Sequence, residues 1–140
     1  MAEYQKPLPV VNEDTREYWA SCQRHELVIQ HCFACGRFQF YPRGVCAHCL
    51  SEDLEWTKAS GKGQIYSYSV VQRPPTKAFA PDVPYTIAVI ELAEGVRMMT
   101  NIVDCPPEEV QIGMPVEVVF DDVTAEISLP KFRPARAGAE

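Results

Sequence analysis

The sequence predicts a mostly β protein in which a short N-terminal helix and a rubredoxin-like zinc ribbon precede a five-stranded OB-fold barrel. Two observations predict this arrangement. Two Cys-x-x-Cys pairs, Cys32/Cys35 and Cys46/Cys49, are separated by ten residues, a spacing typical of a four-sulfur metal site. Beyond Gly61, strand-like segments follow one another almost to the C-terminus, and five of them match the strand count of an OB-fold.

The helix is predicted over residues 14–23, within an N-terminal segment 1–24. The run from Asn12 to Thr15 offers N-cap side chains and negative charge, and Tyr18, Trp19 and Cys22 then recur at near-helical spacing. A chain of this size has a small hydrophobic core, which can bury little of such a helix. We therefore expect Tyr18 and Trp19 to pack on a neighbouring surface, and they are candidate contacts to a partner protein.

The ribbon is predicted over residues 25–60, with strands at 27–30, 38–41 and 54–57 around the cysteine pairs. Four thiolates close a tetrahedral shell and leave no open position for substrate, so the metal is expected to be structural. Zinc is the expected ion. Iron is the alternative, because Gly36 follows Cys35 as in rubredoxin knuckles, whereas Leu50 follows Cys49 and supplies no such turn.

The barrel is predicted over residues 61–134, followed by a flexible tail over 135–140. The segment 85–92 is rich in β-branched residues, and the turn Ala93-Glu-Gly95 should join it to the next strand as a hairpin. A single helical turn is expected at 106–110. The five strands are expected at 64–71, 85–92, 96–103, 116–120 and 127–132.

Composition limits the partners. The chain has 140 residues, 46% of them hydrophobic, with a formal charge of −6 and a pI near 5.1. The acidic total disfavours nucleic acid, which requires a basic surface, and no apolar run reaches the length of about eighteen residues that a membrane span needs. The thiols and the absence of an apolar signal region at the start of the sequence lead us to expect a reducing, cytoplasmic location.

The sequence motifs do not include a recognisable set of catalytic residues. Cys105 is the cysteine nearest to a possible nucleophile, but no histidine follows His48 in the sequence to activate it. The acidic residues around Cys105, at a proline-rich turn, are expected to be solvated. We therefore predict no catalytic residue and no stand-alone enzyme.

The candidate ligand surface is the connection over residues 73–84, which contains four prolines. A loop of this length in a small barrel is uncommon unless it binds something, and OB-folds use such loops for ligands. Phe79 is a candidate for stacking on another ring or filling a pocket of another protein, and Arg73 or Lys77 for meeting phosphate groups. A second basic set, Lys131, Arg133 and Arg136, closes the chain and is expected to reach over a partner subunit.

The order of the motifs resembles a known family, over about residues 14–134. The motifs are Cys-x-x-Cys-Gly-Arg, Cys-x-x-Cys, Gly61-x-Gly63-x-Ile65-Tyr66-Ser67, Phe79-Ala-Pro-Asp-Val-Pro-Tyr85, Glu94-Gly-Val-Arg97, Ile112-Gly-Met-Pro-Val-Glu-Val118 and Leu129-Pro-Lys-Phe-Arg-Pro134. They are similar to the zinc-ribbon plus OB-fold acyl-CoA-associated family, the "domain of unknown function" 35 family.

The resemblance implies a non-catalytic accessory subunit of a thiolase-fold enzyme in a hetero-oligomer. Partners of this family include thiolases, hydroxymethylglutaryl-CoA synthase and the retro-aldolases of steroid side-chain degradation, all acting on acyl-CoA thioesters. The resemblance further implies that such a subunit stabilises the enzyme and helps to shape the CoA or acyl site. Phe79 would then stack on the adenine ring or fill an enzyme pocket, and Arg73 or Lys77 would meet CoA phosphates. The candidate contacts to CoA or the partner are Arg73, Lys77, Phe79, Lys131 and Arg133.

Two alternatives of another class stay open. The first is a single-stranded nucleic-acid module that stacks bases on Tyr66, Tyr68 and Phe79. The second is a rubredoxin-like electron carrier, which would need iron in place of zinc.

Overall fold

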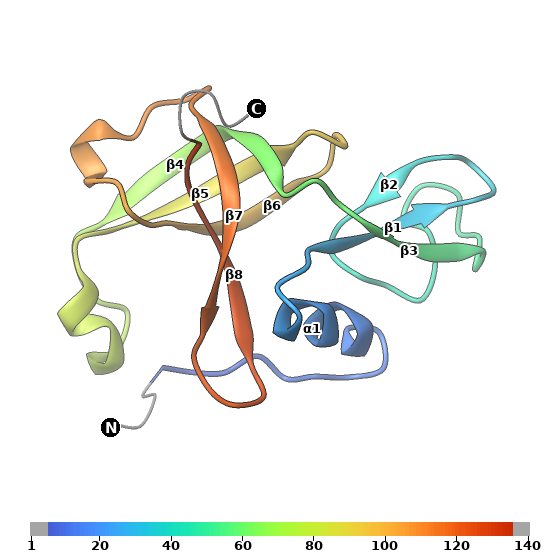
Figure 1. The fold of residues 1–140 in the computed structure, drawn as a ribbon, viewed down its shortest axis with the longest axis horizontal. Coiled ribbons are helices and arrows are strands. Elements are labelled where there is room, and N and C mark those ends of the chain that lie inside the picture. The colour runs from blue at the N-terminus through green and yellow to red at the C-terminus, as the bar shows by residue number, and fades with distance from the viewer. Residues whose placement is uncertain (1–5, 136–140) are drawn as a thin grey trace.

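The computed structural model describes residues 6–135, and an α-helix, a small ribbon and a barrel follow one another along this part of the chain (Figure 1). Arg136 and most of the predicted tail lie outside the described residues. Helix α1 spans Arg16–Gln23, and the ribbon strands are β1 (Val28–Cys32), β2 (Phe38–Gln39) and β3 (Leu54–Lys58). The barrel strands are β4 (Lys62–Val71), β5 (Tyr85–Leu92), β6 (Arg97–Ile102), β7 (Pro115–Asp122) and β8 (Ser128–Pro134). The predicted mostly β fold, with its ribbon and five-stranded barrel, is confirmed.

Helix α1 begins two residues later than predicted because a turn precedes it. The backbone N–H of Thr15 donates to the Asn12 side-chain oxygen and that of Asn12 donates to Thr15 Oγ1, both at 3.1 Å. The side chains of Asn12 and Thr15 thus bond to each other's backbone. Neither side chain donates or accepts a capping hydrogen bond at the first turn of the helix. The helix buries Tyr18, Ser21 and Cys22.

The ribbon sheet has the order β2-β1-β3, and its second strand is shorter than predicted. Two buried glutamines, Gln30 and Gln39, bond to the connection that follows it. The Oε1 atom of Gln30 accepts from the Arg43 backbone N–H at 2.9 Å, and that of Gln39 accepts from the Ala47 N–H at 2.7 Å. These side chains satisfy backbone groups of the connection that follows β2, and they hold that connection on its way to the second cysteine pair.

The barrel is closed in the order β4-β5-β6-β8-β7, with β4 also paired to β7. Strands β5 and β6 form the predicted hairpin, in register from Thr86–Ile102 to Glu91–Arg97. The 3-10 helix η1 (Lys77–Asp82) occupies the connection between β4 and β5, and η2 (Pro107–Glu109) is the single turn predicted between β6 and β7.

Strands β6 and β8 meet through a single pair, Ile102 with Phe132. Pro130, two residues before Phe132, has no N–H with which to continue this parallel ladder. Its carbonyl instead accepts from Thr100 Oγ1 at 3.1 Å. The barrel is therefore weakly closed along this seam.

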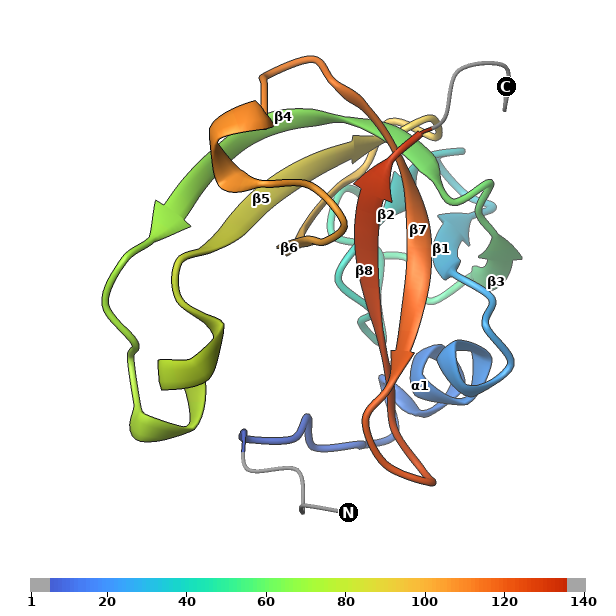
Figure 2. The ribbon, with the colours of Figure 1, turned by 60° about the vertical axis from the view of Figure 1, so that its left-hand side comes forward.

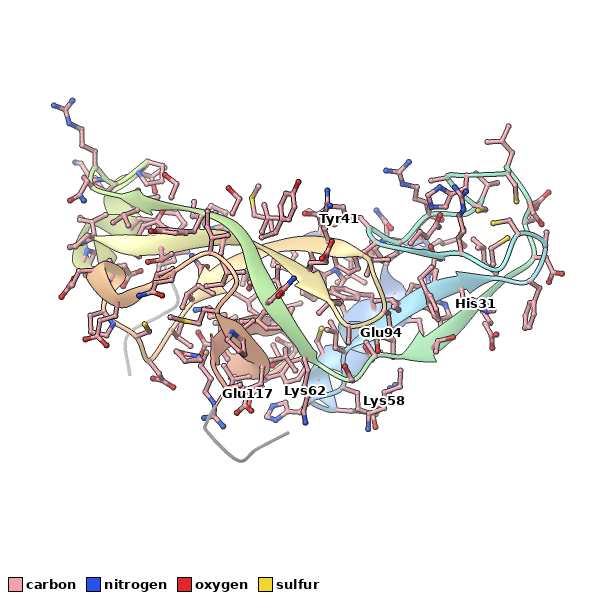
Figure 3. All side chains as sticks on the ribbon, turned by 90° about the horizontal axis from the view of Figure 1, so that it is seen from above. His31, Tyr41, Lys58, Lys62, Glu94 and Glu117 are labelled. Atoms are coloured by element: carbon pink, nitrogen blue, oxygen red, sulfur yellow. The ribbon has the colours of Figure 1, made fainter. Side chains whose placement is uncertain are left out.

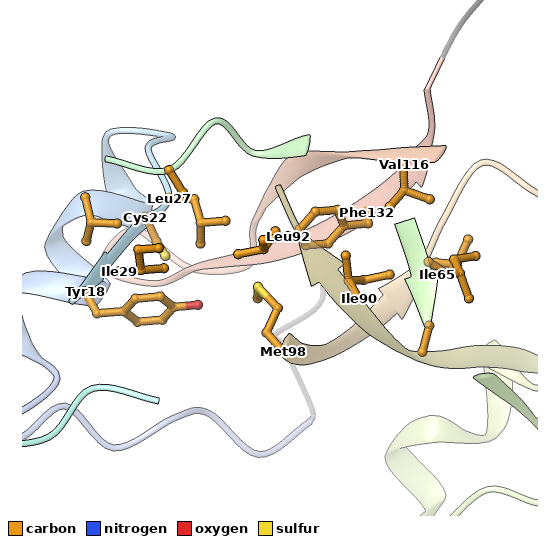
Figure 4. Close-up of a cluster of buried hydrophobic side chains, with 14 of the residues drawn as sticks. Tyr18, Cys22, Leu27, Ile29, Ile65, Ile90, Leu92, Met98, Val116 and Phe132 are labelled. Atoms are coloured by element: carbon orange, nitrogen blue, oxygen red, sulfur yellow. The ribbon is translucent and has the colours of Figure 1, made fainter. Parts of the chain in front are cut away.

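One apolar core runs from the ribbon base into the barrel (Figure 4). Tyr18, Leu27 and Ile29 lie at one end of it, and Ile90 and Phe132 lie within the barrel, each no more than 5% exposed. The helix and the base of the ribbon are thus packed on the barrel. No helix within residues 6–135 is long and apolar enough to cross a membrane.

Candidate metal centre and ligand surface

The four ribbon cysteines converge on one point. The sulfurs of Cys32, Cys35, Cys46 and Cys49 all lie within 4.8 Å of one another, with 3.6 Å between Cys32 and Cys49 and 3.7 Å between Cys35 and Cys46. A tetrahedron with zinc–sulfur bonds of about 2.3 Å has edges of about 3.8 Å. The donor set therefore fits a zinc ion held by four thiolates.

The two knuckles share one backbone design. In the first, the Gly36 N–H donates to the Cys32 carbonyl at 2.8 Å, and in the second the Leu50 N–H donates to the Cys46 carbonyl at 2.9 Å. Both closing residues are left-handed, with φ of 78° at Gly36 and 65° at Leu50. Leu50 thus adopts, with some strain, the left-handed turn that we expected only after the first cysteine pair, where glycine follows.

The close sulfurs differ in acidity. A backbone hydrogen bond from Ser51 favours thiolate at Cys49, but desolvation and the sulfurs of Cys32, Cys46 and Cys35 raise the pKa of Cys49 to about 12, whereas the surroundings favour thiolate at Cys46. Desolvation opposes its ionisation, but hydrogen bonds from the backbone N–H groups of Cys49 and His48 lower the pKa of this thiol to about 6. The thiolate is the form that binds metal. With four sulfurs and no open position, the ion can hold the knuckles together but cannot activate water.

The histidines take no part in this shell. His31 Nδ1 lies 3.1 Å from Glu55, and His48 Nδ1 lies 3.3 Å from Arg37. His25 Nε2 lies 2.8 Å from Asp122, at the junction of α1 and β7. Each histidine has a polar partner of its own, so the four cysteines alone form the metal centre.

The predicted CoA-contact residues are only partly brought together. Phe79 of η1 and Lys131 of β8 line one hollow of about 470 Å³, together with Lys6, Asp82, Tyr85 and Asp121. We call this the charged hollow. Arg73 and Lys77 are exposed on the connection beside it.

Arg133 lies elsewhere. Its guanidinium pairs with Glu117 of β7 at 2.9 Å, and Glu117 lies toward the opposite side of the molecule from Tyr41 (Figure 3). Lys131 and Arg133 are two residues apart on β8 and therefore on the same face of the strand, but they pair with different carboxylates of β7, Lys131 with Asp121 and Arg133 with Glu117. The predicted contact of Arg133 with CoA or a partner stays a prediction.

The charged hollow depends on a residue that the sequence did not single out. Lys6 pairs with Asp82 and lies 5.6 Å from the centre of the Phe79 ring, which itself stacks on Tyr85 at 6.0 Å. The N-terminal segment thereby reaches η1, as the two views of the ribbon show (Figure 2). A lone lysine before a proline carries no signal of this in the sequence.

Tyr18 and Trp19 have different environments. Tyr18 is 5% exposed and packs edge-on against Phe40 at 5.3 Å, so little of its ring is accessible to a partner. Trp19 is half-buried and lines a groove of about 320 Å³ with Phe40, Tyr41, Met99, Leu129 and Pro130 among others. We call this the apolar groove. It lies over the β6–β8 seam.

The two cysteines outside the ribbon lie in surroundings that oppose their ionisation. Cys105 is half-buried, and its pKa is raised by desolvation and by the nearby Glu109 and Glu108 carboxylates, which opposes a reactive thiolate. The buried thiol of Cys22 has its pKa raised to about 12 by desolvation. Neither cysteine has the features of a catalytic residue.

Fold and site together define the class: a structural-zinc ribbon joined to an OB-fold barrel. The family model described as "ChsH2, rubredoxin-like zinc ribbon domain" matches residues 19–55. The model described as "ChsH2, C-terminal OB-fold domain" matches residues 56–121.

Relatives extend this match over almost the whole chain. A "DUF35 domain-containing scaffold protein" of Methanothermobacter thermautotrophicus is 41% identical over 84% of this chain and 88% of its own. A "Probable enoyl-CoA hydratase alpha subunit" of Thermomonospora curvata is 41% identical over 93% of this chain but only 40% of its own length. The solved structure "Ltp2-ChsH2(DUF35) aldolase" superposes with a TM-score of 0.83 and 40% identity, over 92% of this chain and 100% of that one.

The chain therefore belongs to the DUF35 family of scaffold proteins, with the zinc ribbon and OB-fold of the ChsH2 type. The resemblance noted from the motif order is confirmed.

Proposed function

We propose that this chain is a non-catalytic accessory subunit of a thiolase-fold enzyme, either a thiolase or a retro-aldolase of steroid side-chain degradation. It stabilises the enzyme and helps to shape the site for its acyl-CoA thioester. The observation that carries the proposal is the closed four-cysteine shell, which leaves no open position for substrate, beside two other cysteines whose pKa values are raised. The likeness to a chain named for an aldolase complex over its full length supports it.

A hydratase is the second candidate partner. The Thermomonospora curvata relative is named an enoyl-CoA hydratase alpha subunit, and this chain spans 40% of it. Both candidates act on acyl-CoA thioesters and differ in the enzyme to which the ribbon and barrel attach.

Affinity capture of the tagged chain from its native cells, at moderate salt and with nuclease treatment as a parallel arm, tests the partner. We expect mass spectrometry to recover a thiolase-fold chain in near-equal amount. Recovery of a hydratase would select the second candidate. Nuclease-sensitive nucleic acid without an enzyme would contradict both and favour a single-stranded nucleic-acid module.

A pair of charge reversals tests the CoA contact. Lys77→Glu places a negative charge on the connection beside the charged hollow, and Lys58→Glu makes the same change on exposed strand β3 of the ribbon. In the reconstituted complex we expect Lys77→Glu to raise KM for acyl-CoA several-fold at low salt, and Lys58→Glu to leave it unchanged. Equal changes in KM in the two variants would contradict a CoA contact at this loop.

Metal analysis distinguishes the proposed accessory subunit from a rubredoxin-like electron carrier. A colourless preparation with one zinc ion per chain is the expected result. A coloured, iron-containing centre in the chain from native cells would contradict it, since iron is the ion that electron transfer requires.

A further inference from the structure

Strand β4 has an unpaired edge over residues 66–71, which we call the open edge. The strand pairs with β5 along almost its whole length, but with β7 only over residues 62–64. The backbone of Ile65 still exchanges hydrogen bonds with the loop that precedes β7. Beyond Ile65 the strand runs away from β7 toward η1 (Figures 1 and 2). In the described chain, residues 66–71 form backbone hydrogen bonds to β5 alone.

Both faces of β4 are accessible at the open edge. Four consecutive residues from Tyr66 to Ser69 are exposed, with Tyr66 at 48% and Tyr68 at 37%. Successive side chains of a strand point to opposite faces, so neither face is covered here. Every second residue of an edge strand presents its N–H and C=O groups sideways to solvent. The open edge can therefore pair with a further strand.

The open edge lacks two features that usually prevent such pairing. Natural edge strands are protected by charged side chains and by prolines, among other devices. Residues 66–71 are Tyr-Ser-Tyr-Ser-Val-Val, with no charge and no proline, and tyrosine and valine favour strands. A bulge lies between Ile65 and Ser67, and from Ser67 onward the register with β5 is regular. The regular part of the open edge is thus suited to strand addition.

The sequence of the open edge is complementary to itself. Residues 67–69 read Ser-Tyr-Ser, which is the same in both directions. An antiparallel pair of copies with a two-fold axis at Tyr68 places Tyr68 opposite its own copy and Ser67 opposite Ser69. Cross-strand aromatic pairs and hydroxyl pairs stabilise sheets. The flanking residues, Tyr66 and Val70, then lie opposite each other and carry no charge.

We infer that the open edge binds the open edge of a second copy of this chain, antiparallel about Tyr68, so that the two barrels share one continuous sheet. The contact is isologous and closes at two copies, because each chain uses the same edge. The charges beside the edge also permit it. Arg97 lies 3.8 Å from the centre of the Tyr66 ring and pairs with Glu91, so this neighbouring pair carries no net charge.

The dimer leaves the other surfaces of the chain free. The barrel order places β5 between β4 and β6, whereas the apolar groove and the charged hollow lie at β6 and β8. Each dimer therefore presents two grooves and two hollows to other proteins. The inference goes beyond the proposed function and does not require it, since the dimer forms from this chain alone.

Sedimentation equilibrium and hydrogen exchange on the zinc-loaded full chain test the contact. We expect a monomer–dimer equilibrium that shifts with protein concentration and forms nothing larger. Hydrogen exchange at low and high concentration locates the interface. Dimer formation should add protection to amides within residues 66–71 and leave those of β8 unchanged.

Two double variants at the same exposed positions test the register. Ser67→Lys with Ser69→Lys places like charges opposite each other across the axis, which destabilises strand pairs. Ser67→Lys with Ser69→Glu places opposite charges there. We expect the first variant to raise the dissociation constant of the dimer at least about tenfold and the second to leave it unchanged or lower.

A mixing experiment controls for misfolding. The double-lysine chain and a chain with Ser67→Glu and Ser69→Glu should each be monomeric alone and form a mixed dimer when combined, which misfolded chains could not do. Three results would overturn the inference: an unaltered chain that stays monomeric at high concentration, equal weakening in the two register variants, or added protection only outside β4. Capture of an enzyme by a chain that stays monomeric would keep the proposed function and exclude the dimer.

Discussion

The tip of the zinc ribbon and the barrel are held together by different forces. At the tip, Phe33, Val45 and Leu50 are 57%, 39% and 76% exposed, and the buried side chains near them are those of Cys32, Cys46 and Gln39. In the barrel, Ile90 and Phe132 are fully buried in a shared core. A segment as short as the ribbon tip cannot bury enough apolar surface to be stable alone. The comparison teaches that metal binding stabilises the ribbon tip, whereas buried apolar side chains stabilise the barrel.

Replacement of a metal ligand should have the largest effect and should be confined to the tip. Cys46→Ser removes one of four thiolates, and structural zinc in small peptides contributes on the order of 10 kcal/mol to folding. We expect loss of bound zinc and of amide protection between residues 32 and 54, with protection kept in β5 and β8. Metal content and hydrogen exchange measure these.

The control for this change is Cys105→Ser, a half-buried cysteine outside the ribbon, which should retain its zinc. If the barrel lost protection together with the tip in Cys46→Ser, the two regions would be one cooperative unit and the comparison would be wrong.

Removal of a barrel core ring should come next. Phe132→Ala deletes a fully buried side chain, and such a change costs about 3–5 kcal/mol. The urea midpoint should fall accordingly. Phe33→Ala, at the exposed ribbon tip, should change the free energy of unfolding by no more than about 0.5 kcal/mol. Equal effects of the two would mean that the tip has an apolar core after all.

The two knuckles allow a finer comparison within the tip. Gly36→Ala places a β-carbon at a left-handed φ and should destabilise the ribbon by about 1–2 kcal/mol. Leu50→Gly removes the same strain from the second knuckle, offset by the larger unfolded-state entropy of glycine. We expect it to stabilise the ribbon by less than about 1 kcal/mol. Competition for zinc with a chelator of known affinity, run on both variants, measures the difference, and a loss in Leu50→Gly would contradict it.

The smallest effect concerns the link between the two regions. The hydrogen bond from His25, the residue that leads from α1 toward β1, lowers the pKa of Asp122 on β7. A carboxyl whose folded pKa is below its unfolded value contributes stability above about pH 4, and this contribution is lost as the pH falls through the folded pKa. Asp122→Asn should remove that part of the acid-side loss. Urea midpoints between pH 5 and 2 test this, and unchanged slopes in the variant would exclude the link.

Much of the architecture was predictable because its signals are local. The cysteine spacing sets four sulfurs around one point through two tight turns, and runs of alternating or β-branched residues mark the barrel strands. The hairpin of β5 and β6 follows from a turn of a few residues between two such runs. These features need no knowledge of distant parts of the chain.

Other features could not be predicted because they depend on residues far apart in the sequence. Gln30 and Gln39 look like ordinary polar strand residues, yet each satisfies backbone groups of the loop over residues 40–47. Leu50 carries no sign of a left-handed turn. The Lys6 contact with η1 joins the N-terminal segment to a loop more than seventy residues away.

The sequence by itself determined the four-cysteine site and the five strands of the barrel, since both follow from local spacing and periodicity. Only the tertiary structure decided which candidate residues meet. It put Phe79 and Lys131 in one hollow, paired Arg133 with Glu117, buried Tyr18 and opened a groove beside Trp19. The reason is that each of these outcomes depends on pairing between segments far apart in the sequence, such as β7 with β8 and the N-terminal segment with η1.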